Sequence, residues 1–154
     1  MGVPVRRHGR RLLLGLALGA ALTAGTGAPA LADPAGPTDY RSEVVAVEPR
    51  SATIETDIIG GDSFFELTVA PGTEAFVIGY QGEDILWFRA DGTVWENRNS
   101  PSTYLNEDRL GGGGIPPNAS VDAEPDWRQV ASDGCFAWHD HRAHWMQEAR
   151  PFGL

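Results

Sequence analysis

Apolar and polar residues alternate with a period of two along much of the chain after residue 40. In the segment 53–59, Thr53, Glu55 and Asp57 alternate with Ile54, Thr56 and Ile58. Successive side chains of a strand point to opposite faces, so this pattern predicts a half-buried β-strand. Other short apolar segments are bounded by turn residues in the same way. We expect strands at 44–47, 64–69, 74–80, 85–89, 93–95, 127–131 and 135–139.

Turn sequences separate these segments at intervals of about 8 to 12 residues, the spacing of small all-β domains. They are Pro49-Arg50-Ser51, Gly60-Gly61-Asp62-Ser63, Pro71-Gly72, Asp91-Gly92 and Ser132-Asp133-Gly134. Asp-Gly suits the positive φ angles of a tight hairpin. No long segment has the 3.6-residue period of an amphipathic helix. The sequence therefore predicts an all-β fold: a single Ig-like β-sandwich or small barrel of about seven or eight short strands.

One long loop, residues 96–125, interrupts the pattern with Asn, Ser, Gly and Pro residues. Loops of this length in a compact domain are usually functional or disordered. Within it lie four polar candidates: Asn106, Glu107, Asp108 and Arg109. Paired carboxylates can serve as oxygen ligands or as an acid/base pair, although such runs are more often solvated loop surface. A hydrolase that combines Glu107 or Asp108 with a histidine is one hypothesis.

The first residues have the features of an export signal. Four arginines (Arg6, Arg7, Arg10, Arg11) precede an apolar run at 12–22, and Ala30-Leu31-Ala32 supplies small residues for cleavage. The run is shorter than the roughly 20 residues that span a bilayer. We expect a cleavable signal peptide at 1–32, cut near Ala32 after Sec or twin-arginine export. A flexible leader at 33–39 and a β-domain at 40–150 would follow, secreted or in the cell envelope, with no transmembrane segment.

The expected mature chain is strongly acidic. Residues 33–154 contain all 21 Asp and Glu residues but only eight of the 12 arginines, and the chain has no lysine, so the formal net charge there is −13. Binding to nucleic acid or to an anionic membrane requires cationic side chains. The charge therefore argues against both partners and leaves a cell-envelope protein as the expected partner.

Three of the four histidines lie within six residues near the C-terminal end, in the segment 138–146. On a strand, His139 and His141 would share one face about 7 Å apart, close enough to bind one ion. Copper or zinc would be held by nitrogen bonds of about 2.0–2.1 Å. His144 would complete the set if the chain bends after Arg142, and the thioether of Met146 would favour copper. We take these four residues as the candidate metal ligands.

The same segment also fits a purely structural role. Asp140 would lie on the opposite face of the strand, as a hydrogen-bond partner of a histidine ligand or as the salt-bridge acceptor of Arg142. Trp138 and Trp145 could stack on Arg142 as a cation–π lid. In this alternative the cluster clasps the 96–125 loop to the sheet. The chain contains no Gly-x-Ser-x-Gly elbow, P-loop or dinucleotide fingerprint, so nothing in it indicates an enzyme.

Several segments together resemble a family of exported actinobacterial proteins of uncharacterised function. They are Asp33–Ser42, Ile59–Ser63, Ser100–Arg109 and the histidine-rich segment Trp138–Met146. The lack of lysine and the abundance of Ala, Gly and Pro are typical of a GC-rich coding genome, which agrees with such a source. The resemblance supplies no catalytic residues. From the sequence as a whole we expect a binding or interaction module of the cell envelope. Members of that family look longer and often end in a transmembrane helix, so we expect this chain to be a short or truncated form.

Overall fold

The computed structural model describes residues 40–147 and confirms the all-β prediction. It contains seven strands and one short helix: β1 (Ile54–Ile59), β2 (Phe64–Val69), β3 (Ala75–Ile78), β4 (Asp84–Phe88), β5 (Val94–Asn97), α1 (Pro101–Leu105), β6 (Trp127–Ala131) and β7 (Cys135–His139). The expected signal peptide, the leader and residues 148–150 of the expected domain lie outside the described residues.

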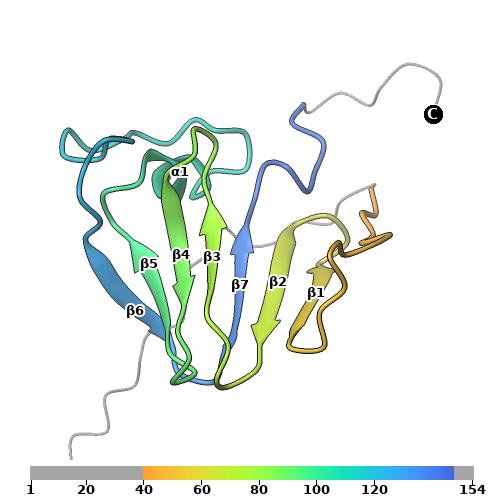
Figure 1. Cartoon of the computed structure of the whole chain (residues 1–154). Coiled ribbons are helices and arrows are strands. Elements are labelled where there is room, and N and C mark those ends of the chain that lie inside the picture. Colours follow the sequence, from red (N-terminus) through yellow and green to blue (C-terminus); the bar gives the residue numbers. More distant parts are fainter. Residues whose placement is uncertain (1–39, 148–154) are drawn as a thin grey trace, which may run out of the picture.

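The strands form two antiparallel sheets, one in the order β1-β2-β7 and the other in the order β3-β4-β5-β6 (Figure 1). The buried core is made by both sheets: Val69 of β2 packs with Leu86 and Phe88 of β4, while Phe136 of β7 packs against this cluster. The described strands do not close into a barrel, so the sandwich-like alternative is the one that the chain adopts.

The chain passes from one sheet to the other after β2 and again at the turn from β6 to β7, and this second link requires a glycine. Gly134 donates to the carbonyl of Gly92 (2.7 Å) and accepts from the backbone nitrogen of Val69 (2.8 Å). Its φ is +74°, and a Cβ at this position would lie 2.5 Å from the Val69 carbonyl oxygen. Any side chain would therefore push β2 and β7 apart at this point.

Two sequence-based expectations are wrong in detail. The segment 44–47 forms no strand: Val45 is 94% exposed, and β-branched residues favour a strand only when a neighbouring strand is available to pair with them. The 96–125 segment is not one loop, because β5 extends to Asn97 and α1 follows. Ser100 caps this helix and Pro101 opens it, a recognisable start signal.

The segments that carry the predicted site residues gather at one end of the molecule. β7 and β3 both end there, and α1 lies at the same end (Figure 1). The turn between β1 and β2 reaches it as well, through the ion pair of Asp62 with Arg109 in the loop after α1. Over residues 40–147, no helix has the length and apolar character needed to cross a membrane.

Candidate metal centre

The three clustered histidines converge at the end of β7. His139 is the last residue of the strand, and the chain then turns, with the backbone nitrogen of Ala143 donating to the carbonyl of Asp140 (2.9 Å). One ring nitrogen from each of His139, His141 and His144 lies within 4.8 Å of the other two. The expectation that His139 and His141 share a strand face is wrong, because His141 lies in the turn. The bend needed to bring His144 into the set is present.

Each imidazole is held by a backbone carbonyl through one ring nitrogen. The acceptors are the carbonyl of Asn106 for His139 Nδ1 (2.9 Å), that of Asp108 for His141 Nε2 (2.8 Å) and that of Trp145 for His144 Nδ1 (2.9 Å). A carbonyl can only accept, so the nitrogen facing it carries the proton. In the neutral ring the other nitrogen keeps its lone pair, which is the tautomer that metal-binding histidines adopt.

The contact between His139 and His144 places these two lone-pair nitrogens face to face. Their Nε2 atoms are 2.8 Å apart, and the rings are nearly parallel with centroids 4.6 Å apart. Two neutral rings in these tautomers would repel one another, so a proton or a cation between them is required for attraction. Two nitrogens bound to one ion at about 2.0 Å lie about 2.8 Å apart at a right angle and about 3.3 Å apart at the tetrahedral angle. The observed separation is close to the first value.

Burial keeps His139 in the form that can bind a metal. Only 7% of the residue is exposed. Desolvation by burial lowers the pKa of its imidazole below the usual 6.5, the carbonyl of Asn106 opposes this shift, and the nearby His144, His141 and Arg109 reinforce it. The neutral, ligating form is therefore favoured over a wider pH range than in a solvated histidine.

Asp140 holds the turn that carries the histidines. It is 1% exposed, and its carboxylate accepts from Trp138 Nε1 (3.0 Å) and from three donors of Arg142: the backbone nitrogen (3.0 Å), Nε (2.8 Å) and Nη2 (2.6 Å). Burial raises the pKa of this carboxyl, but the bonds from Arg142 and Trp138 outweigh burial, so the pKa lies below its usual value. The expected ion pair of Asp140 with Arg142 is present.

The aromatic cover of Arg142 differs from the expectation. Its guanidinium lies over the ring of Tyr80 at 5.3 Å, and its Nη1 donates to the carbonyl of Ile78 (2.9 Å). Trp138 instead stacks on Phe65 of β2, with centroids 5.5 Å apart. Arg142 thus joins the turn after β7 to the end of β3.

Tyr80 is a functional candidate that the sequence did not reveal. Its hydroxyl donates to the side-chain oxygen of Asn106 and accepts from the backbone nitrogen of His141 (3.1 Å). Burial, followed by the charge of Asp140, raises the pKa of its phenol to about 12, so it stays protonated. In the sequence, Tyr80 stands between Gly79 and Gly82. These glycines indicate a turn, but they do not identify the residues that Tyr80 contacts.

The loop candidates contribute backbone groups more than side chains. The carboxylate of Asp108 accepts from the backbone nitrogens of Leu110 (2.9 Å) and Gly112 (2.8 Å), and these bonds lower its pKa. Arg109 donates to both oxygens of the buried Asp62, each at 3.1 Å. Glu107 is exposed. Asp108 therefore shapes its own turn, which weakens the hypothesis of a hydrolase that uses this carboxylate as an acid or base.

Met146 lies at the edge of the cluster. A Cβ placed on Gly111 would be 3.4 Å from Cε1 of His141 and 3.9 Å from Cε of Met146, so the glycine leaves space for both side chains. Met146 is 37% exposed and Trp145 is 38% exposed. The methyl end of Met146 thus lies on the same side of Gly111 as His141, and the side chain is partly open to solvent.

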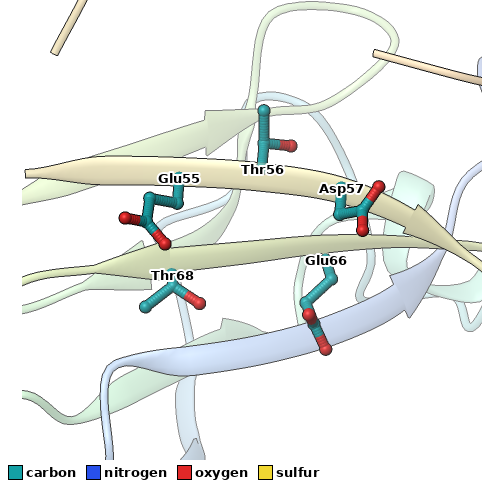
Figure 2. Close-up of a pocket in the computed structure, with 5 residues that line it drawn as sticks. All are labelled: Glu55, Thr56, Asp57, Glu66 and Thr68. Carbon is teal, nitrogen blue, oxygen red and sulfur yellow. The ribbon is translucent and has the colours of Figure 1, made fainter.

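A second group of possible ligands lies on the outer face of β1 and β2. Glu55, Asp57 and Glu66 line a shallow hollow there with Thr68, while Thr56 points to the other side of its strand (Figure 2). Asp57 and Glu66 are direct partners across the two strands. Within residues 40–147, no ring or buried hydrogen-bond network orients these carboxylates. Asp57 accepts from the backbone nitrogen of the next residue, Ile58 (2.8 Å).

No protein-family model, curated protein or solved structure matches this chain. The geometry of the histidine cluster is therefore the basis for proposing a function.

Proposed function

We propose that this protein is an exported binding module that holds a copper or zinc ion on His139, His141 and His144. The observation that carries the proposal is the set of three carbonyl acceptors. Each one fixes the proton of its histidine on the nitrogen that faces the carbonyl, so every ring keeps a lone pair on its other nitrogen. For His139 and His144 these are the Nε2 atoms that face each other. The protein's own carbonyls supply these bonds, so they can orient the rings without help from the ion.

The donor set selects the kind of metal. Imidazole nitrogen suits copper and zinc, whereas magnesium and calcium prefer oxygen. Three histidines leave a fourth coordination position for water or another ligand. Met146, whose terminal methyl and the His141 ring both border Gly111, is our candidate for that ligand, and its thioether would favour copper.

Calorimetric titration of the metal-free protein with Zn²⁺ and Cu²⁺ tests the proposal. We expect one saturable site, and its loss in a variant with His139, His141 and His144 all changed to alanine. The matched control replaces Glu55→Gln, Asp57→Asn and Glu66→Gln and should bind as the parent does. No saturable binding, or equal binding by the triple histidine variant, would sink the proposal.

A second candidate function is a structural clasp, and the same network supports it. His139 and His141 both hold carbonyls of the loop after α1, while Arg142 holds β3. If the clasp matters without metal, His139→Ala or Arg142→Ala should lower the melting temperature by several degrees in the presence of chelator. Unchanged melting under those conditions would count against this role.

The proposal also includes export of the protein and a partner in the cell envelope. The basic and apolar N-terminal sequence and the small residues before Ala32 support export, and the acidic mature sequence supports a partner in the cell envelope rather than nucleic acid. Amino-terminal sequencing of the secreted form should begin at Asp33. Retention of the intact N-terminus in the cytoplasm would contradict export.

A further inference from the structure

The outer face of the four-stranded sheet carries three clustered aromatic rings. Phe76 of β3 stacks on Trp87 of β4 with centroids 5.5 Å apart and planes 11° apart. Trp127 of β6 lies 5.6 Å from Trp87 and 6.5 Å from Phe76. We call Phe76, Trp87 and Trp127 the aromatic platform. It extends across the sheet and shares no residue with the histidine cluster.

The platform is fixed in position by its neighbours. Phe76 and Trp87 are register partners on adjacent strands. Trp87 Nε1 donates to the carboxylate of Glu74 (2.8 Å), and the guanidinium of Arg89 lies 4.9 Å from the ring centre of Trp87. Rings that are already ordered lose little entropy when a ligand covers them.

Part of the platform is open to solvent at an energetic cost. Phe76 is 46% exposed, and Ile78, two residues further along β3, is 44% exposed. The core does not need these side chains, because Ala75 and Val77 of the same strand pack against it instead. An exposed apolar patch on a rigid sheet is a common mark of a binding surface.

The charges around the platform favour a neutral ligand. The two charged side chains that contact Trp87 have opposite signs, Glu74 and Arg89, and Arg89 is paired with Asp91 at 3.6 Å. The full chain has a formal net charge of −9. Nucleic acid and anionic lipid would therefore meet long-range repulsion without a local cationic patch to offset it.

The size of the platform favours a slender ligand over a second protein. With 46% of Phe76 exposed and the two tryptophans only partly exposed, the rings together offer less than about 300 Å². A stable protein interface buries about 800 Å² on each partner. A chain of sugar rings needs less. One sugar can lay its C–H face on the exposed part of Phe76 while its neighbours contact the partly exposed tryptophans and direct their hydroxyls to the polar rim.

We propose that the aromatic platform binds a neutral polysaccharide chain. Glu74 and Arg89 lie beside the rings and can accept from and donate to sugar hydroxyls. The aromatic platform is independent of the proposed metal ion, so metal removal should leave polysaccharide binding unchanged. The protein would then attach to a glycan surface through one face and present the histidine cluster at the end of its strands.

Affinity electrophoresis of the purified protein in native gels tests this proposal. The gels contain hydroxyethylcellulose, α-mannan or arabinogalactan, with dextran sulfate as the anionic comparison. We expect retardation by at least one neutral polymer and none by dextran sulfate. Phe76→Ala and Trp127→Ala should weaken that binding by about tenfold. Phe76→Tyr, which keeps the ring, and Val45→Ala, at a fully exposed site, should bind as the parent does.

Three outcomes would overturn the proposal. The first is no retardation by any of the three neutral polymers. The second is equal retardation of Phe76→Ala, with a parent-like melting temperature that shows the variant is folded. The third is a dimer in sedimentation experiments that Phe76→Ala abolishes, which would make the platform an interface between copies of this chain.

Discussion

Two clusters of possible metal ligands differ in how the fold prepares them. At the end of β7, one nitrogen from each of three histidines converges within 4.8 Å, and each ring is oriented by a carbonyl. On the outer face of β1 and β2, Glu55, Asp57 and Glu66 line a hollow (Figure 2). There Asp57 and Glu66 face each other as like charges across the strands. The difference shows that ligand-type side chains become a site only when other groups hold them in place.

The largest expected effect of a single substitution is at the turn that orients the histidines. Asp140→Asn removes a 1%-exposed carboxylate that accepts four hydrogen bonds. We expect the free energy of unfolding to fall by about 2–4 kcal/mol, the lower end reflecting the half-exposed Arg142. Urea denaturation of the metal-free protein measures this. The matched change Asp57→Asn should not destabilise; an equal loss in both variants would remove the contrast between the clusters.

Tyr80→Phe should have a smaller effect on both stability and metal binding. It removes one bond to Asn106 and one to the backbone of His141, while the ring under Arg142 remains. We expect a loss of about 1 kcal/mol in stability and about a tenfold lower metal affinity. Calorimetric titration provides the affinity. If the affinity is unchanged, the tyrosine does not help to orient the ligands.

The pH dependence of stability should carry the signature of His139. Its folded pKa lies below the unfolded value of 6.5, so the unfolded chain binds more protons between these two values. The stabilisation is complete above about pH 6.5 and is lost as the pH falls through the folded pKa. Urea unfolding of the metal-free protein at about pH 8 and about pH 5 measures this. His139→Gln should flatten the trend, whereas Asp57→Asn should keep the parental slope.

The smallest effect is expected at the acidic hollow. Asp57→Asn relieves a like-charge pair with Glu66 across β1 and β2. We expect a gain of about 0.5 kcal/mol, reduced by added salt. A loss of stability on this substitution, or a lower zinc affinity, would mean that other groups hold these carboxylates in place as they do the histidines.

The sequence predicted the fold class well because strand periodicity is local. The alternation in 53–59 and the Asp91-Gly92 turn specify a strand and a hairpin without knowledge of distant partners, and both are present as β1 and the β4–β5 turn. The segment 44–47 failed for the opposite reason: three valines cannot form a strand unless a neighbour pairs with them. The helix at Pro101–Leu105 was overlooked although Ser100-Pro101 is a normal start signal.

The candidate site was predicted only as a set of histidines. Strand geometry suggested that His139 and His141 share a face, but β7 ends at His139 and the turn brings His144 into contact with it. That turn depends on Asp140, and the ring orientations of His139 and His141 depend on carbonyls 33 residues away along the chain. Backbone carbonyls carry no sequence signature, so their role could not be deduced from residue types.

X-ray absorption spectroscopy of the protein loaded with one equivalent of Zn²⁺ or Cu²⁺ tests the central claim most directly. The account predicts three imidazole nitrogens in the first shell at about 2.0–2.1 Å, with their number reduced by each single His→Ala change at 139, 141 or 144. A first shell of oxygen atoms alone, or one that the histidine changes leave intact, would contradict it.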